Sequence, residues 1–395
     1  MRTIGMDIHR SFAQIAVLEG GQIREERRLE LTRDAVLAFA ATLRPDDEVV
    51  LEATGNTAAV VRLIRPSVGR VVVANPVQLR AIAYARVKTD KIDAAMLARI
   101  QASGFLPEVW IADEGTLEQR RLASERAALL RQIMRVKSRI HAILHANLLP
   151  PYTGHLFSKA GRKWLEQQPL PDTERAMLRR QVVQLEQLST AIDEFDKRLA
   201  GRALNDPRAR RLMTIAGINV IVATSVLAAI GDIERFRSPA KLTSYLGLTP
   251  RVRQSGDRPA AHGHITKCGN SIARHMLVEA AWSASKTAGP LRSFFRRIQV
   301  KSGGAVAAVA TARKMAALIW HMLTKQADYA WARPAFVAMK LRKVELKAGA
   351  SRATGKAGPG HDYWIKELRQ REVELVTRAE EAYARSVANW KERPA

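Results

Sequence analysis

The first hundred residues alternate between two hydrophobic periodicities, and this alternation constrains the fold more than any other feature. Apolar runs over residues 4–8 and 12–18 predict two strands, and Gly20-Gly21 joins the second to a third strand over residues 22–31. Helix and strand patterns then alternate, with helices predicted over 32–43, 56–64, 76–85 and 90–102 and short strands over 48–51 and 71–74. Three meandering strands followed by alternating helices and strands predict an α/β sandwich.

Two long amphipathic runs follow this region. Residues 114–149 and 172–199 each carry apolar side chains at helical spacing, and the first run is interleaved with Arg and Lys. The Pro150-Pro151 pair stops the first helix. Together the runs predict a coiled-coil arm, which serves either for dimerisation and spacing or as an internal hairpin packed on the same chain.

The remainder of the chain is predicted to be helical. A compact segment rich in glycine turns spans 205–284, a Gly/Ala/Lys-rich and flexible stretch spans 348–360, and a polar helix spans 363–389. A chain of 395 residues is expected to hold more than one core. Four regions result: an α/β domain (1–112), a helical coiled-coil arm (113–204), a helical domain (205–325) and a basic helical extension (326–395), for which a solvated tail is the expectation.

The charge balance indicates a polyanionic partner. Lys and Arg total 64 against 38 Asp and Glu, a net charge of +26, which raises the local concentration of nucleic acid. A basic binding protein without an active site fits the same balance. The single cysteine, Cys268, excludes an internal disulfide, and no Cys/His cluster has zinc-ligand spacing. With no leader-like start and no apolar stretch of about 18 residues, we expect a cytoplasmic protein without a membrane partner.

Carboxylates occur where apolar strands are predicted. Asp7 lies inside one strand, where a charge is costly unless it is paired, and Glu52 ends another. Asp90 and Asp93 are three residues apart and so share one face near a helix start, where capping and dipole pairing are the ordinary explanation. Convergence of the four acids would allow two divalent ions, Mg²⁺ or Mn²⁺, about 3.5 to 4 Å apart to hold the oxygens of a phosphodiester.

Three short sequence motifs resemble those of a known protein family. Ile4-Gly5-Met6-Asp7-Ile8-His9, Leu51-Glu52-Ala53-Thr54-Gly55-Asn56 and Lys88-Thr89-Asp90-Lys91-Ile92-Asp93-Ala94 resemble the DEDD transposases of the insertion-sequence family numbered one-ten. Asn75-Pro76 and Arg80 also look like that family. The resemblance implies a metal site built from the four acids, akin to that of Holliday-junction resolvases. It also agrees with a ribonuclease H-like (RuvC-like) fold for the first domain, within an overall class of α/β plus all-α.

A second resemblance lies in the helical domain. The run Leu212-Met213-Thr214-Ile215-Ala216-Gly217-Ile218-Asn219 resembles a helix-hairpin-helix, in which amides near Gly217 face a DNA phosphate; an ordinary tight helix connection is the alternative. The run Arg251-Val252-Arg253-Gln254-Ser255-Gly256-Asp257 resembles the second domain of the same transposases, which implies that Ser255 is the nucleophile. Without the resemblance, Ser255 is an exposed loop hydroxyl.

Basic residues surround the predicted nucleophile. Those expected to bind nucleic acid and stabilise developing charge are Arg251, Arg253, Arg258, Lys267 and Arg274. The histidines are scattered rather than spaced as metal ligands, and they include His9, His141, His145, His262 and His264. Lys301-Ser302-Gly303-Gly304 lacks a P-loop lysine and is interpreted as a helix connection.

These observations predict a site-specific recombinase. It would cut and rejoin DNA through a covalent Ser255 phosphodiester, with magnesium held by Asp7, Glu52, Asp90 and Asp93. The family resemblance further implies an element-encoded RNA, a homodimer or homotetramer, and association with the bacterial nucleoid. One alternative is a metal-dependent nuclease or junction resolvase that uses water. The other is a non-catalytic basic nucleic-acid-binding protein.

Overall fold

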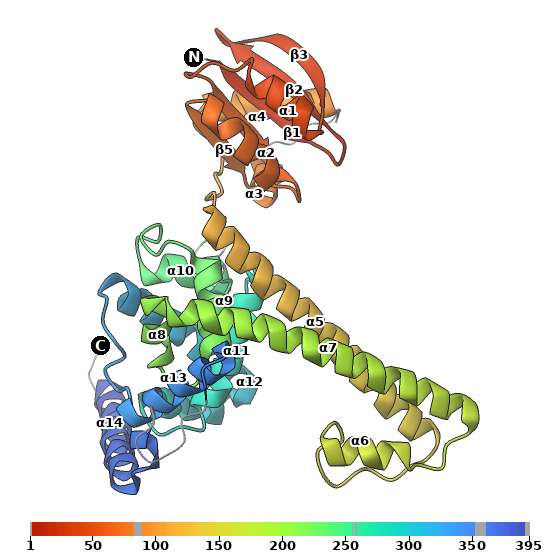
Figure 1. Cartoon of the computed structure of the whole chain (residues 1–395). Helices are drawn as coiled ribbons and strands as arrows, with labels where there is room; N and C mark the ends of the chain where they lie inside the picture. Colours follow the sequence, from red (N-terminus) through yellow and green to blue (C-terminus); the bar gives the residue numbers. More distant parts are fainter. Residues whose placement is uncertain (1, 83–88, 255, 257–258, 352–360, 392–395) are drawn as a thin grey trace. The chain divides into compact units, whose positions relative to one another are not determined.

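The chain forms two compact units, which are described separately. The computed structural model describes residues 2–82, 89–254, 256, 259–351 and 361–391. The first unit is Met1–Ala112 and the second is Asp113–Ala395 (Figure 1). The second unit therefore contains the arm, the helical domain and the C-terminal extension, which the sequence analysis predicted as three separate regions.

A five-stranded mixed sheet organises the first unit. Its strands are β1 (Thr3–Ile8), β2 (Phe12–Glu19), β3 (Gln22–Glu30), β4 (Glu48–Glu52) and β5 (Arg70–Ala74). The order across the sheet is β3-β2-β1-β4-β5, in which β1, β2 and β3 pair antiparallel and β4 lies parallel to both β1 and β5. The three-stranded meander and the two short parallel strands agree with the sequence prediction.

Helices cover both faces of this sheet. They are α1 (Arg33–Ala40), α2 (Thr57–Ile64), α3 (Pro76–Ile82) and α4 (Asp90–Ala102), with a short 3₁₀ turn η1 (Arg65–Ser67) after α2. Ile4, Met6 and Ile8 of β1 pack in one cluster with side chains of α1 and α2, whereas α3 and α4 contribute to a cluster on the other face. Since successive side chains of a strand point to opposite faces, Gly5 and Asp7 belong to the face that α4 covers. The predicted end of the 76–85 helix lies partly outside the described residues.

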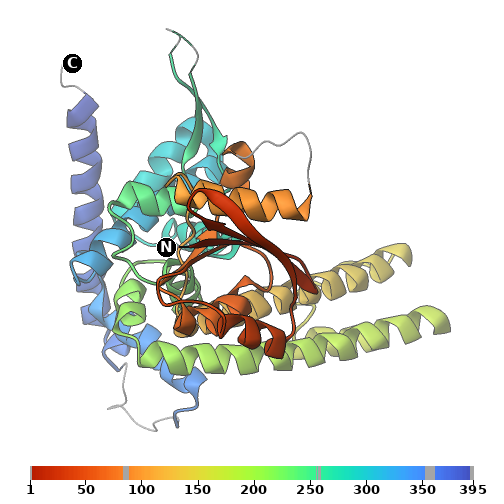
Figure 2. The ribbon, with the colours of Figure 1, turned by 90° about the horizontal axis from the view of Figure 1, so that it is seen from above.

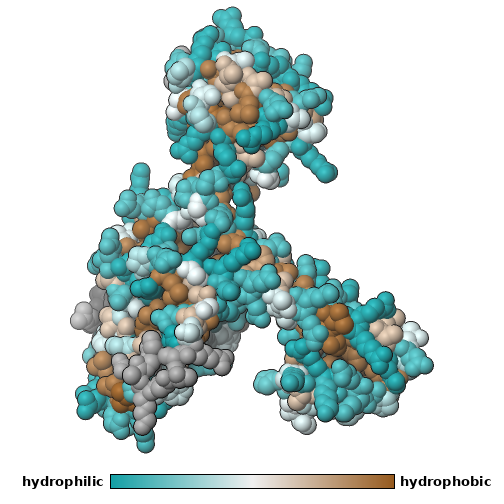
Figure 3. All heavy atoms as spheres, viewed as in Figure 1, coloured by the Kyte–Doolittle hydropathy of each residue, from teal (hydrophilic) through white to brown (hydrophobic). Residues whose placement is uncertain are grey.

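Two 33-residue helices form the arm of the second unit. They are α5 (Glu114–Ala146) and α7 (Asp172–Leu204), and they lie side by side in Figures 1 and 2. The buried side chains of α7 include Leu178, Leu185, Ile192 and Leu199, which recur every seven residues. A short helix, α6 (Lys159–Glu166), packs at the far end of the arm, and the surface of the arm is largely hydrophilic with a hydrophobic patch near that end (Figure 3).

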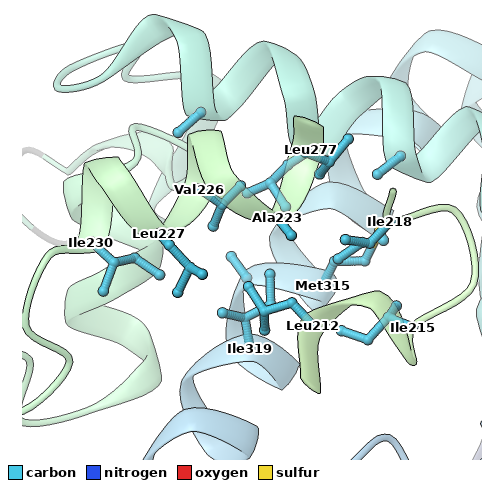
Figure 4. Close-up of a cluster of buried hydrophobic side chains, with 14 of the residues drawn as sticks. Leu212, Ile215, Ile218, Ala223, Val226, Leu227, Ile230, Leu277, Met315 and Ile319 are labelled. Carbon is cyan, nitrogen blue, oxygen red and sulfur yellow. The ribbon is translucent and has the colours of Figure 1, made fainter. Parts of the chain in front are cut away.

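The main core of the second unit lies among short and long helices. The participating elements are α8 (Pro207–Met213), α9 (Val220–Ile230), α10 (Pro239–Tyr245), α11 (Ser271–Ala284), α12 (Pro290–Thr324) and α13 (Pro334–Ala348). Figure 4 shows Leu212 and Ile215 packing toward Met315 and Ile319, which lie about a hundred residues later in the sequence. This core closes around α9, whose residues are nearly all buried.

A β-hairpin interrupts the region that the sequence predicted to be helical. Strands β6 (Pro250–Arg253) and β7 (Ala261–Ile265) pair antiparallel, and the hairpin projects from the helices in Figure 2. The prediction was therefore incomplete here. Strands of four and five residues with basic side chains are too short to show a distinct periodicity in the sequence.

The expectation of a solvated tail is wrong for the described part of the extension. Lys340 of α13 donates hydrogen bonds from Nζ to the carbonyls of Met213, Ile215 and Ile218, at 2.8, 2.9 and 2.9 Å. Burial lowers the pKa of Lys340 to about 8. Farther along α13, Lys347 pairs with the buried Asp196 of the arm. The extension is therefore part of the second unit's packing.

The last helix is also attached. After the 3₁₀ turn η2 (His361–Trp364), α14 (Lys366–Lys391) contacts α12. Glu380 accepts hydrogen bonds from Arg292 Nη2 at 2.6 Å and from the Gly289 amide at 3.0 Å. These bonds hold Glu380 at the start of α12.

One described helix has the length and hydropathy of a membrane span. This helix is α12, and half of its apolar stretch is buried inside the fold. Gly303 interrupts it with φ 80° and ψ 166°, so the helix consists of two stretches joined at the glycine pair that the sequence analysis interpreted as a connection. The buried side chains of its second stretch contribute to the core in Figure 4.

Candidate functional site

The close approach of α4 to β1 sets the position of the acids in the first unit. A Cβ placed on Gly5 would meet the Ala94 carbonyl oxygen at 2.0 Å and the Ala98 nitrogen at 2.9 Å. Only glycine allows the helix to come this near the strand. Asp7 is two residues farther along the same face, toward the beginning of α4.

The first turn of α4 carries the other two aspartates. Thr89 caps the helix, because its hydroxyl accepts a hydrogen bond from the Ile92 amide at 3.3 Å. Asp90 and Asp93 follow directly, where the helix dipole favours negative charge. The structure thus supports the capping-type explanation for their local placement and also puts them beside Asp7.

The electrostatics of Asp7 show that all four predicted acids are neighbours. Burial raises the pKa of Asp7 above its usual range, and the negative charges of Asp93, Asp90 and Glu52 raise it further, while His9 lowers it. Glu52 is brought there by the sheet, because the parallel pairing of β1 and β4 reaches Met6 and Leu51 one residue earlier. A cluster of this kind is costly without a positive partner.

A hydrogen-bonded loop after β4 supports the cluster. The Thr57 hydroxyl donates to the Glu52 carbonyl at 2.9 Å and accepts from the Thr54 amide at 2.7 Å. Asn56 donates from Nδ2 to the backbone carbonyl of His9 at 3.0 Å. The loop therefore links the end of β4 to the end of β1.

His9 is a member of the cluster that the sequence analysis discounted as scattered. Its Nε2 lies 3.2 Å from Asp7 Oδ2 and 3.4 Å from Asp90 Oδ1. One ligand atom from each of the three side chains lies within 4.8 Å of the others. In the sequence, only the position of His9 two residues after Asp7 could have indicated that it joins the cluster. This spacing does not match a known metal-ligand motif.

The second group of predicted residues lies in the second unit. Ser255 and Arg258 lie outside the described residues. Arg251 and Arg253 on β6, and Lys267 after β7, are all exposed. They therefore present cations on and near the hairpin, and Ser255 falls between its two strands in the sequence.

Two other predicted contacts to nucleic acid have structural partners. Arg274 donates from Nη1 to the carbonyls of Leu246 and Cys268, both at 3.0 Å. Gly217 has φ 87°, and a Cβ there would meet the Ala280 carbonyl oxygen at 2.2 Å. Local packing thus accounts for both residue types at these positions.

A wide groove of about 1080 Å³ lies beside the hairpin. Its wall combines Ile265 of the hairpin with Phe294 and Val309 of α12 and with cations from α12 and from the segment after β7. The cations are Lys267, Arg313 and Lys314. Burial lowers the pKa of Lys314, and neighbouring Arg297 lowers it further.

Comparison with known proteins assigns both regions to one family. A family model described as a transposase of the DEDD IS110 type matches residues 4–147, and one described as "Transposase IS116/IS110/IS902 family" matches residues 209–296. The chain belongs to this family of DEDD transposases. The transposase is thus an enzyme that cleaves and rejoins DNA, and the strand order of its first unit agrees with the ribonuclease H-like fold of DEDD domains.

Individual relatives agree with this assignment. A putative transposase, y4qE, from Sinorhizobium fredii is 28% identical over 71% of the chain and 71% of that protein. The transposase for insertion sequence element IS1111A from Coxiella burnetii is 26% identical over 83% of the chain and 91% of its own length. A pilin gene-inverting protein from Moraxella bovis is 30% identical over 47% of the chain and 51% of its own length.

The DEDD domain implies a divalent metal ion, and the residues of the transposase fit one. Carboxylate oxygens are ligands that Mg²⁺ and Mn²⁺ favour. Burial and mutual repulsion raise the pKa of Asp7, which a cation at this place would offset. His9 Nε2 is also buried without a hydrogen-bond partner. The cluster is therefore suited to hold a divalent cation.

Proposed function

We propose that the transposase exchanges DNA strands through a covalent bond to Ser255, with Mg²⁺ or Mn²⁺ held by Asp7, Glu52, Asp90 and Asp93. The convergence of the acids is the observation that supports the proposal most. Ligand atoms of Asp7, His9 and Asp90 lie within 4.8 Å of one another, and the pairing of β1 with β4 brings Glu52 to the same end of the sheet. Structural capping explains Asp90 and Asp93 alone. It does not explain why Asp7 is placed in their field inside a buried strand.

The chemical roles divide between the two units. Asp7, Glu52, Asp90 and Asp93 would hold the divalent ions, which would stabilise the negative charge that develops on the phosphodiester oxygens. The sheet positions Asp7 near the end of β1 and Glu52 at the end of the parallel strand β4, and the first turn of α4 positions Asp90 and Asp93. Ser255 Oγ forms a bond to phosphorus as the bond to one sugar oxygen breaks, the serine hydroxyl proton passes to that departing oxygen, and rejoining reverses this exchange. Arg251, Arg253, Arg258 and Lys267 offset the charge of the phosphate.

Further partners follow from the family and the charge. We infer that an element-encoded RNA selects the DNA sequences, since a net charge of +26 suits two polyanions. We also infer that the protein assembles as a homodimer or homotetramer. The buried side chains that recur every seven residues in α7 pack against α5 of the same chain, as in the internal hairpin, so the assembly is inferred from the family alone. Gly217 and Arg274 would act on DNA indirectly. Gly217 would fix the connection between α8 and α9 against α11, and Arg274 would fix the segment around Leu246.

A covalent-trapping assay tests the proposal. Purified full-length protein, Mg²⁺, its candidate RNA and a labelled DNA containing an element junction are incubated and run on a denaturing gel. Wild-type protein should give a protein-linked DNA band, and Ser255→Ala should not. Asp7→Asn should bind DNA but form no linked band, because DNA binding depends on the Lys and Arg side chains rather than on the carboxylates.

Other outcomes of this assay would favour one of the two alternative functions. Cleavage by both wild type and Ser255→Ala without a linked band would mean that water is the nucleophile, as in a nuclease or junction resolvase. DNA binding without cleavage by wild-type protein, under conditions that support excision by a related transposase, would favour a binding protein. Either result would overturn the serine mechanism.

A further inference from the structure

His9 is held in a fixed orientation against the acid cluster. Its amide donates to the Phe12 carbonyl at 2.9 Å, and its carbonyl accepts from Asn56 Nδ2 at 3.0 Å. The imidazole ring stacks on Phe12, with the ring centres 4.5 Å apart and the planes 27° from parallel. These contacts therefore hold both the backbone and the ring of His9 in place.

The ring nitrogen that points to the acids has no hydrogen bond. His9 Nε2 is buried and makes no bond of acceptable geometry, although it lies 3.2 Å from Asp7 Oδ2 and 3.4 Å from Asp90 Oδ1. The side chains themselves remain reachable, with 14% of Asp7, 38% of His9 and 49% of Asp90 exposed. An ion pair would explain why these atoms are close. It would not explain why Nε2 makes no hydrogen bond of good geometry to either carboxylate.

The separations suit ligands of a shared ion. Two ligand atoms at right angles on an ion that bonds at about 2.1 Å lie about 3 Å apart. The distances from Nε2 to the two carboxylate oxygens are close to this value. In that arrangement the lone pair of Nε2 faces the ion, and the ring proton is on Nδ1.

We propose that His9 is a metal ligand of the acid cluster and gives the site a preference for a transition-metal ion such as Mn²⁺ over Mg²⁺. The inference rests on the proposed metal function of Asp7 and Asp90. Imidazole suits first-row transition metals, whereas Mg²⁺ favours oxygen ligands and retains water. A site made of carboxylates alone would have a smaller preference.

Direct spectroscopy of bound Mn²⁺ provides the test. The full-length wild-type protein is stripped with chelator and loaded with Mn²⁺, and electron spin-echo modulation is used to detect nitrogen coupled to the metal. Wild-type protein should show the coupling of one imidazole nitrogen, which should change on labelling histidine with ¹⁵N. His9→Ala should lack it, and His145→Ala, which removes an exposed histidine of the arm, should retain it.

Calorimetry gives the matching affinities. His9→Ala should weaken Mn²⁺ binding by about 10- to 100-fold and Mg²⁺ binding by much less, since the loss of a residue that shapes a metal site has effects of this size. Circular dichroism melts check that the variant is folded. If His9→Ala is unfolded, the ¹⁵N-sensitive signal of the wild-type protein still decides the question.

The outcomes separate this inference from the proposed function. Mn²⁺ binding that is lost in Asp7→Asn but shows no nitrogen coupling in wild type would overturn the role of His9 and leave the acid site intact. Mn²⁺ binding that is unaffected by Asp7→Asn would overturn the acid site, and His9 ligation with it. An unchanged ratio of Mn²⁺ to Mg²⁺ affinity in His9→Ala would contradict the proposed selectivity.

Discussion

Replacing Gly5 with alanine should displace α4 from the sheet and disperse the acid cluster. The added Cβ would lie 2.0 Å from the Ala94 carbonyl oxygen, whereas an ordinary contact needs at least 3.4 Å. The obstructing atom belongs to the backbone of a helix, so no side-chain rotation relieves the clash. The helix must move by about 1.4 Å, and Asp90 and Asp93 move with it.

The expected magnitudes follow from this displacement. Overpacking of a close contact costs about 1–3 kcal/mol of unfolding free energy. A shift of about 1 Å in a catalytic group costs about 100-fold in rate. Gly5→Ala should therefore lower both the stability of the first unit and the rate of DNA cleavage, and weaken Mn²⁺ binding in parallel.

Urea unfolding followed by circular dichroism, together with a DNA-cleavage time course, measures both effects. Gly201→Ala is the matched control, because a Cβ on this glycine of α7 meets nothing within 4 Å. The control should retain activity and gain up to about 1 kcal/mol of stability. Wild-type stability and cleavage in Gly5→Ala would refute the argument that contact between β1 and α4 positions the acids.

Three further predictions concern the second unit. Lys340→Met should cost about 3 kcal/mol in urea unfolding at neutral pH, since it leaves three buried carbonyls without their donor, whereas Met at the exposed Lys343 of the same helix should cost little. Gly217→Ala should also cost about 3 kcal/mol by the same measurement, because φ is 87° and a Cβ meets backbone at 2.2 Å; near-wild-type stability would contradict this packing. Hydrogen bonds from the Thr116 hydroxyl and amide lower the pKa of Asp113, so its stabilisation is present above the unfolded pKa of about 4 and is lost as pH falls through the lower folded pKa. Asp113→Ala should therefore cost about 1 kcal/mol at neutral pH and less in acid, and a cost independent of pH in urea titrations would rule out the charge of this cap.

The sequence predicts those elements whose signal is long and local. The meander of β1–β3 and the two long helices follow from periodic side chains. The acids Asp7 and Glu52 stand out because a charge within an apolar strand needs a reason. Their proximity to each other requires only that β1 and β4 are parallel neighbours.

Other features depend on contacts that no local pattern records. His9 reaches the acids because the chain turns between residues 9 and 12 and because Asn56 binds its carbonyl. The β6–β7 hairpin is too short and too basic to give a strand signal. Lys340 looks like any lysine of a basic helix, since its three carbonyl partners are 122 to 127 residues earlier.

This separation has a consequence for the order in which the protein is made. Synthesis proceeds at about 5–20 residues per second, so the loop after α8 emerges roughly 6–25 s before Lys340 is available to bind it. During that interval the carbonyls of Met213, Ile215 and Ile218 lack the side-chain donor that they have in the folded unit. The second unit thus reaches its final packing only near the end of translation, after the acid-bearing first unit has been made in full.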